Sequence, residues 1–232
     1  MIIKSYCKIN LFLKVLKKNK KGLHNIQSTT MLIELHDKIS IKKIKKKKDE
    51  VIFTGHFKKN INRSTNTVTN TLSILRSQNL LNKKNRYKIV INKKIPVYAG
   101  LGGGTGNAVA IIKYFLKNKI SSKTIQVCEE KIGTDLRLFF LNHSFQKNLK
   151  KIKKFSKKYK FNFLLVYPNI KSSTKEVYSK VKKYNLPLTV DPSKILSKDK
   201  YNKFLMNEAN DLQKIVEKKH KKIQIILNLI KT

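Results

Sequence analysis

Five of the eight glycines of this 232-residue chain lie within seven positions, Gly100–Gly106. Glycine permits positive φ angles and has no Cβ, so the N–H groups of consecutive residues can converge on one anion. A helix that begins directly after such a loop adds the positive end of its dipole, which attracts phosphate. The spacing GLGGGTGN differs from the Walker pattern GxxxxGK[ST] and from a dinucleotide-binding fingerprint. The sequence therefore predicts a phosphate-binding loop without a Walker lysine, so another cation must balance the phosphates.

The segments on either side of the loop have the patterns that a phosphate cradle needs. Residues 87–91 alternate between apolar and polar as in a strand, and Ala108, Ile111, Ile112 and Phe115 place apolar side chains on one helical face. Strand, glycine loop and helix then follow in the required order. Similar patterns predict further strands over residues 2–16, 26–34, 38–44 and 161–167, and helices over 66–81, 174–183 and 201–229.

The net charge of +40 suggests a nucleic-acid-binding protein. However, only four of the 53 basic residues are arginines, the side chain that reads nucleic acid through bidentate contacts. The lysines are spread along the whole chain beside abundant isoleucine and asparagine, and all three residues share A/T-rich codons. Genome composition therefore explains the charge, and incidental, non-specific nucleic-acid binding remains the alternative.

The remaining composition points to a cytoplasmic protein. Cys7 and Cys128 form no CxxC pair, and the five histidines form no cluster with them, which argues against a disulfide scaffold and a structural zinc site. No apolar run approaches the roughly 18 residues of a membrane span. The first 15 residues lack the pattern of a signal peptide.

Three stretches in a fixed order resemble the motifs of the GHMP kinase superfamily, which includes galactokinase and the homoserine, mevalonate and phosphomevalonate kinases. The stretches are SYCKINLFLKV with GLHNIQS at residues 5–28, PVYAGLGGGTGNAV at 96–109 and GTDLRLF at 133–139. Weaker similarities are STKEVY at 173–178 and NEANDL at 207–212. Within the superfamily, GLHNIQS resembles the members that act on a cytidyl diphosphate polyol; homoserine or mevalonate as the acceptor remains an alternative.

The resemblance implies transfer of the γ-phosphoryl group of ATP to the 2-hydroxyl of 4-diphosphocytidyl-2-C-methyl-D-erythritol, in non-mevalonate isoprenoid precursor biosynthesis. Asp135 would accept the hydroxyl proton as general base. Lys8 would lie beside Asp135, hold it ionised and favour alkoxide character. Mg²⁺ would neutralise phosphate charge. The implied ATP-binding loop comprises Pro96, Val97, Tyr98, Ala99, Gly100, Leu101, Gly102, Gly103, Gly104, Thr105 and Gly106. The motifs identify no protein ligand for the metal.

The resemblance also implies where the acceptor binds. Asn10 and His24 would line its site, with His24 hydrogen-bonded to the cytosine. Thr174 and Tyr178 would come from the second domain, with Tyr178 as an aromatic platform for the base. Leu23 replaces the tyrosine that the family carries beside this histidine, so one stacking surface is missing.

Other departures concern the loop, the segment after Asp135 and the C-terminal domain. Gly106 replaces a serine, which leaves Thr105 as the only hydroxyl of the loop, and Leu136-Arg137 replaces Val-Pro. No glycine follows Gly133, so the third glycine-rich motif of the superfamily is missing, and we expect a shortened C-terminal domain.

The patterns alone predict a mixed α/β protein, and the resemblance implies an α+β fold with the two domains of a GHMP kinase. The first, an ATP-binding domain over residues 1–155, would contain a left-handed βαβ unit. The second, over residues 156–232, would be a truncated ferredoxin-like domain. The lysine-dense stretch at residues 147–160 is the expected junction.

Overall fold

Two long strands, β1 (Ile2–Lys18) and β2 (His24–Ile44), each pass through both units into which the chain divides. The computed structural model describes residues 2–19 and 22–231. The first unit comprises the residues up to 8, 32–97 and 101–142, and the second comprises 9–31, 98–100 and 143 onward. The domain boundary expected at residue 155 stays a prediction, since the units are discontinuous in sequence.

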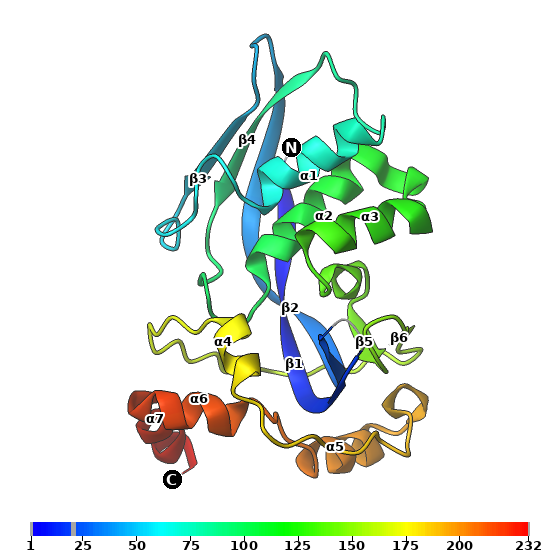
Figure 1. Ribbon diagram of the computed structural model, residues 1–232, viewed down its shortest axis with the longest axis vertical. Coiled ribbons are helices and arrows are strands. Elements are labelled where there is room, and N and C mark those ends of the chain that lie inside the picture. Colours follow the sequence, from blue (N-terminus) through cyan, green and yellow to red (C-terminus); the bar gives the residue numbers. More distant parts are fainter. Residues whose placement is uncertain (1, 20–21, 232) are drawn as a thin grey trace. The chain divides into compact units, whose positions relative to one another are not determined.

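In the first unit, the C-terminal half of β2 pairs antiparallel with β4 (Arg86–Asn92), and β4 pairs parallel with β3 (Glu50–Thr54). The helix α1 (Thr67–Ser77) connects β3 to β4, so these three elements form a βαβ unit. Its left-handed crossover stays a prediction. After β4 come α2 (Gly103–Leu116) and α3 (Ser122–Ile132), which lie beside α1 (Figure 1). Two 3₁₀ turns, η1 (Lys117–Lys119) and η2 (Leu136–Phe140), follow α2 and α3.

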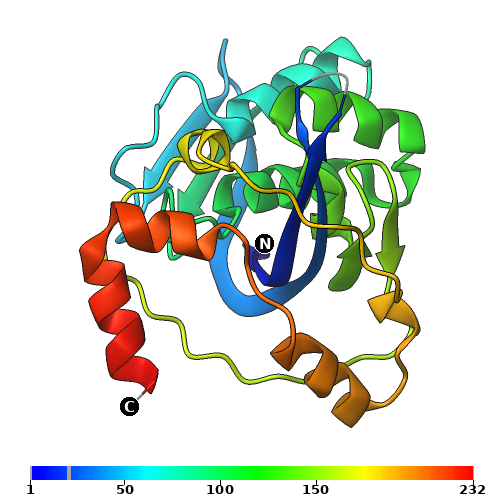
Figure 2. The same ribbon diagram turned by 60° about the horizontal axis from the view of Figure 1, so that its bottom comes forward.

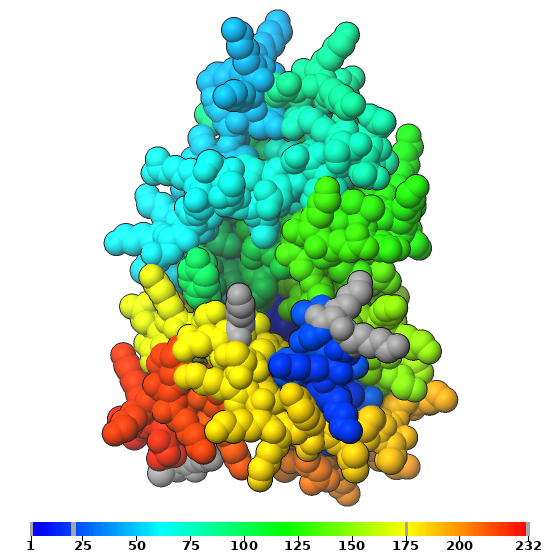
Figure 3. Space-filling model, viewed as in Figure 1, coloured from blue at the N-terminus to red at the C-terminus, as the bar shows by residue number. Residues whose placement is uncertain are grey.

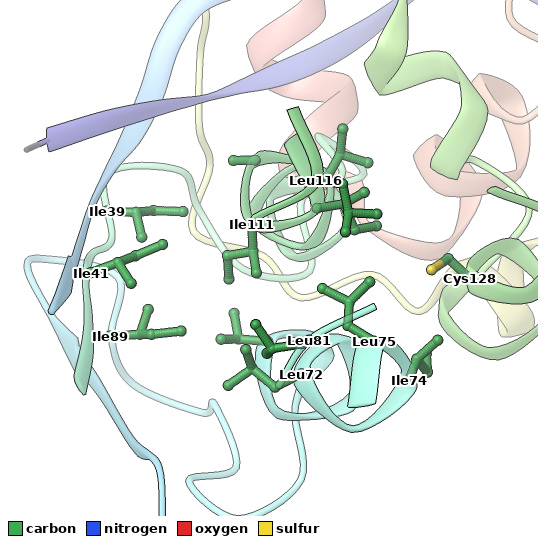
Figure 4. Close-up of a cluster of buried hydrophobic side chains, with 14 of the residues drawn as sticks. Ile39, Ile41, Leu72, Ile74, Leu75, Leu81, Ile89, Ile111, Leu116 and Cys128 are labelled. Carbon is green, nitrogen blue, oxygen red and sulfur yellow. The ribbon is translucent and has the colours of Figure 1, made fainter. Parts of the chain in front are cut away.

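The core of the first unit forms where the strand and helix periodicities meet. Across the β2–β4 pair, Ile39 lies opposite Ile91 and Ile41 lies opposite Ile89. Ile39, Ile41 and Ile89 face the apolar sides of α1 and α2 (Figure 4), and Ile91 belongs to the same buried cluster. The helix α1 begins at a capping box, in which the Asn66 side chain accepts hydrogen bonds from the first turn. This packing holds the end of β4 and the start of α2, the two ends of the glycine loop.

In the second unit, the N-terminal half of β2 pairs with β5 (His143–Gln146), which pairs with β6 (Ile152–Lys154). An aromatic cluster forms its core, and the His143 ring stacks on Phe155 at 3.7 Å and hydrogen-bonds to the Tyr201 hydroxyl at 3.0 Å. The remaining elements are α4 (Thr174–Ser179), η3 (Pro192–Lys194), α5 (Lys198–Met206), α6 (Gln213–Lys219) and α7 (Lys221–Lys231).

Two expectations for the C-terminal part are wrong. The strand expected over residues 161–167 is an extended segment without regular secondary structure (Figure 2). Leu164 there is 83% exposed, and a strand needs a neighbouring strand for its N–H and C=O groups. The helix expected over 201–229 is divided into α5, α6 and α7. It is interrupted because Leu13 of β1 donates to Ala209 O and accepts from Asp211 N, which forces residues 209–211 out of a helix.

The buried His143 makes the stability of the protein depend on pH. Burial lowers the pKa of His143 to about 4, against about 6.5 in an unfolded chain. Between these values only the unfolded chain takes up the proton, so stability falls as the pH is lowered through this window. We expect a loss of about 1–2 kcal/mol between pH 7 and pH 5 in urea denaturation. The His143→Phe variant, which keeps the stacked ring, should lose less; an equal loss in both proteins would contradict the assignment.

Candidate active site

An ion pair joins the beginning of the chain to a residue past its midpoint. Lys8 Nζ on β1 lies 3.0 Å from Asp135 Oδ2, which directly precedes η2, and both residues belong to the first unit. The Lys8 side chain is 8% exposed and that of Asp135 is 37% exposed. The ammonium group is therefore fixed inside the protein, while the carboxylate remains open to a bound molecule.

The glycine loop lies directly against this pair. The Lys8 N–H group donates to Leu101 O at 3.0 Å, which holds the loop on β1. Gly102 has φ 66°, and a Cβ atom there would lie 2.6 Å from Phe139 Cζ and 3.3 Å from Lys8 Cγ. Any side chain at Gly102 would collide with η2, which carries Phe139. The absence of a side chain thus brings the loop into contact with both elements that carry the ion pair.

The helix α2 begins with no side-chain cap. Its N-cap residue, Gly102, makes no side-chain hydrogen bond, and there is no acidic residue in the first turn. The first N–H groups of a helix have no partner within the helix, and the dipole makes this end positive. The start of α2 at Gly103, Gly104 and Thr105 therefore fits a phosphate group, and the Thr105 hydroxyl can add a further contact.

Gly106, where the family motif has a serine, is required by the packing of α2 on β1. A Cβ atom at Gly106 would lie 2.7 Å from Tyr6 O and 3.1 Å from Phe139 Cε1. Both atoms belong to the elements that hold Lys8 and Asp135, so this close approach also sets the distance between the helix and the ion pair. A hydroxyl group at Gly106 has no room here.

Thr67, the first residue of α1, also supports the loop, and the motifs did not indicate it. Its hydroxyl donates to Gly104 O at 2.9 Å. The sequence around Thr67 contains a capping pattern at residues 66–69. This pattern predicts where α1 begins, but it does not predict which residue Thr67 contacts.

The earlier part of the loop follows β4. Pro96 is buried and Val97 half-buried at its start, within the first unit. Tyr98, Ala99 and Gly100 fall in the second unit; Tyr98 and Gly100 have φ angles of 61° and 73°. The Tyr98 carbonyl accepts a hydrogen bond from Ser172 N at 3.3 Å. The expected loop therefore contributes residues to both units.

Among the predicted acceptor residues, the structure brings His24 and Tyr178 together in the second unit. Their ring centroids are 5.4 Å apart, and Tyr184, which the sequence analysis missed, lies 5.9 Å from His24. Burial and then the nearby charge of Lys18 lower the pKa of His24, which favours the neutral form of its ring. Its Nε2 atom is buried without a hydrogen-bond partner among the described residues. A polar atom in this position can accept or donate a hydrogen bond to a ligand.

The other two predicted acceptor residues are in the same unit. Asn10 Oδ1 accepts a hydrogen bond from the Thr30 hydroxyl at 3.4 Å. Thr174 is the exposed first residue of α4, and the side chain of Ser173 caps that helix. Thr174 and Tyr178 lie one helical turn apart on α4.

Lysine side chains gather around a cleft of about 540 Å³ in the second unit. The segment that contains residues 180–183 and the start of the red C-terminal segment lie side by side there (Figure 3). The lining residues are Lys180, Val181, Lys182, Lys183, Asp211, Lys214, Ile215, Lys218 and Lys219. Asp211 accepts hydrogen bonds from Val15 N at 2.6 Å and Asn185 Nδ2 at 2.7 Å. Lysines outnumber acids in the lining even though Lys180 and Lys219 pair with Glu176, so the cleft carries a net positive charge.

Within the described residues, no group of three histidine, cysteine, aspartate or glutamate side chains could hold a metal ion. Likewise, none of the helices in that part of the chain is long and apolar enough to span a membrane. Cys7 and Cys128 are buried free thiols; burial raises the pKa of Cys128 and raises that of Cys7 to about 11, which makes both poor nucleophiles.

Comparison with known proteins agrees with this geometry. Residues 66–133, which contain α1, the glycine loop and α3, match the model of the GHMP kinases N-terminal domain. A crystal structure of a 4-(cytidine 5'-diphospho)-2C-methyl-D-erythritol kinase is similar to this chain with a TM-score of 0.68 at 17% identity. It is matched over 97% of this chain and 81% of that one. A homoserine kinase from Cytophaga hutchinsonii is similar with a TM-score of 0.52 at 19% identity over 80% of this chain and 62% of its own. The expected α+β GHMP kinase fold is confirmed.

The chain belongs to the GHMP kinase family and is an ATP-dependent small-molecule kinase. The sequence relatives share a single name, whereas the similar folds include kinases with different names. The 4-diphosphocytidyl-2-C-methyl-D-erythritol kinase of Pelagibacter ubique is 39% identical over 234 residues, which cover 97% of this chain and 81% of that protein. The kinase of the same name from Ureaplasma parvum is 31% identical, over 92% of this chain and 82% of its own length.

Proposed function

We propose that this kinase transfers the γ-phosphoryl group of ATP to the 2-hydroxyl of 4-diphosphocytidyl-2-C-methyl-D-erythritol, a step toward isoprenoid precursors. The observation that carries the proposal is the Lys8–Asp135 ion pair, at 3.0 Å, held directly against the glycine loop. A carboxylate and an ammonium group beside a phosphate cradle are what transfer to an alcohol requires. The names and identity of the relatives support the acceptor.

In the proposed reaction, Asp135 accepts the proton of the acceptor hydroxyl. The hydroxyl oxygen then forms a bond to the γ-phosphorus, and the bond between that phosphorus and the β–γ bridging oxygen breaks, which releases ADP. Lys8 faces the negative charge that develops on the acceptor oxygen. The N–H groups of Gly103, Gly104 and Thr105 would hold phosphate oxygens. Mg²⁺, when bound with ATP, neutralises phosphate charge; Thr105 is the hydroxyl in the loop that could contact it.

The aromatic cluster of His24, Tyr178 and Tyr184 supports a nucleobase-bearing acceptor. Aromatic faces stack on bases, and a neutral histidine with an unpartnered nitrogen can hydrogen-bond to a cytosine edge. We also propose that the protein acts in the cytoplasm, which the two buried free thiols support. Nucleic acid is at most a non-specific partner. Lysine side chains would bind its phosphates, and salt would weaken that binding.

The acceptor is tested by ADP release from Mg-ATP in the presence of 4-diphosphocytidyl-2-C-methyl-D-erythritol, homoserine or mevalonate. We expect ADP release with the cytidyl compound and none with homoserine or mevalonate. Turnover with homoserine or mevalonate in its place would contradict the proposed acceptor and leave the kinase assignment intact.

Substitution of the aromatic cluster should act on acceptor binding. We expect His24→Ala and Tyr178→Ala each to raise the KM for the cytidyl acceptor by about tenfold, because a stacked base or its hydrogen bond contributes about 1–3 kcal/mol. The KM for ATP should stay unchanged. His56→Ala, an exposed histidine of the first unit, is the matched control. Equal effects of His24→Ala on both KM values would contradict a role in the acceptor site.

A further inference from the structure

Two opposite charges are buried immediately behind the glycine loop. Lys93 directly follows β4, and Asp37 lies in β2; their side chains are 4% and 0% exposed and form an ion pair. Both residues belong to the first unit. A buried ion pair costs desolvation free energy and is often no more stable than an apolar pair of the same size. Its presence beside the loop therefore calls for an explanation other than stability.

The two carboxylate oxygens of Asp37 have different partners. Oδ1 accepts hydrogen bonds from Lys94 N at 2.7 Å and Ile95 N at 2.9 Å, at the point where the chain leaves β4 for the loop. Oδ2 accepts from Lys93 Nζ. One side chain thus fixes both the backbone that enters the loop and the position of a buried ammonium group.

The ammonium group of Lys93 lies against the start of α2. A Cβ atom at Gly103, the first residue of this helix, would lie 3.3 Å from Lys93 Nζ and 2.9 Å from Ile95 Cγ2. The cation and the positive end of the helix are therefore neighbours in a region with little water. The pair as a whole is neutral, but its ammonium end is the end nearest the start of α2, so its dipole adds to the positive potential where an anion would bind.

We propose that the Asp37–Lys93 pair positions the phosphate site and adds to its positive potential. Asp37 holds the backbone that enters the loop, and Lys93 directs its ammonium group, the positive end of the pair, at the start of α2, in a loop that has no Walker lysine. Lys93 acts through the field at the start of α2 and through Gly103, so it is a positioning residue. The proposal rests on the ATP-dependent kinase class and is independent of the acceptor.

The separate roles of the two oxygens allow a direct test by binding, without an acceptor. In Asp37→Asn, the remaining carbonyl oxygen can still accept from Lys94 N and Ile95 N, but Lys93 loses its counter-charge, so stability should fall. In the double variant Asp37→Asn/Lys93→Met, no unpaired charge is left and stability should recover. Mg-ATP affinity, measured by calorimetry, should remain about tenfold weaker in the double variant and in Lys93→Met. Lys94→Met, an exposed neighbour, is the matched control and should bind normally.

Adenosine, which has no phosphates, separates the proposed role from a general distortion of the site. We expect adenosine to bind the double variant as well as it binds the unsubstituted protein, while ATP binds more weakly. Wild-type ATP affinity in the stable double variant would overturn the proposal, as would an equal loss for ATP and adenosine. If the Lys93→Met variant does not fold, the affinities of the double variant for ATP and adenosine still decide the question.

Discussion

Replacement of Asp135 by asparagine is expected to lower the turnover number by about 10²–10⁴-fold, the usual contribution of a positioned general base. Asparagine has nearly the same shape but cannot take the proton of the acceptor hydroxyl. The Asp135 side chain is 37% exposed, so the protein should fold, with some loss of stability because the buried Lys8 loses its counter-charge. Lys8→Met should also abolish most turnover, since the charge beside the reacting oxygen is lost. ADP release under saturating substrates measures both effects.

Mg-ATP binding separates this prediction from a loss of structure. Asp135→Asn should bind Mg-ATP with nearly unchanged affinity, because in the proposed site the backbone of the loop holds the phosphates. Lys8→Met should bind it somewhat more weakly, since this substitution removes a cation beside the proposed position of the γ-phosphate. Asp199→Asn, the same substitution at an exposed aspartate of α5, should retain full turnover. An Asp135→Asn protein with more than a tenth of the normal turnover would show that another group accepts the proton.

Gly106→Ala is expected to destabilise the protein by about 2 kcal/mol, the usual cost of inserting atoms into a well-packed region. The added Cβ atom would meet Tyr6 O at 2.7 Å, and a backbone oxygen of β1 cannot turn aside as a side chain can. The helix would have to move away from β1, which would also shift the loop from the Lys8–Asp135 pair. Urea denaturation measures the loss of stability, and the kinetic assay measures the loss of turnover.

Gly104→Ala, in the same turn of α2, is the matched control. Its Cβ atom would lie 3.3 Å from Thr67 Oγ1, a side-chain atom that can shift by a few tenths of an ångström, at some cost to the hydrogen bond that this hydroxyl donates to Gly104 O. Alanine also favours a helix more than glycine does. We expect a change within about 0.5 kcal/mol. Equal destabilisation by the two substitutions would mean that glycine is needed for loop geometry in general, and not for the contact between Gly106 and β1.

The sequence was most informative where periodicity and packing agree. The alternation in residues 87–91 and the apolar face within 66–81 predicted β4 and α1, because both elements bury the same core between them. It was least informative after residue 155. The apolar run 161–167 has the composition of a strand, but secondary structure there depends on a partner strand, which local sequence does not encode. Likewise, the apolar pattern of 201–229 did not show that residues 209–211 pair with β1.

For the site, the motifs led to Lys8, Asp135, His24 and Tyr178, and the structure brings the first two together and, in the other unit, the last two. The residues that support them could not be found in this way. Thr67 bonds to the loop backbone, Asp37 to the backbone just before the loop, and Lys93 lies beside Gly103, and these contacts depend on the fold. Nothing in a lysine-rich sequence distinguishes Lys93 from its neighbours. The motif indicated Gly106 only as a departure from the family, and the structure explains it by the close contact between α2 and β1.

A crystal structure with Mg²⁺ and a non-hydrolysable ATP analogue tests the central claim most directly. The account predicts phosphate oxygens on the N–H groups of Gly103, Gly104 and Thr105, with the γ-phosphate facing the Lys8–Asp135 pair. A triphosphate bound away from the start of α2, or a γ-phosphate pointing away from that pair, would contradict it.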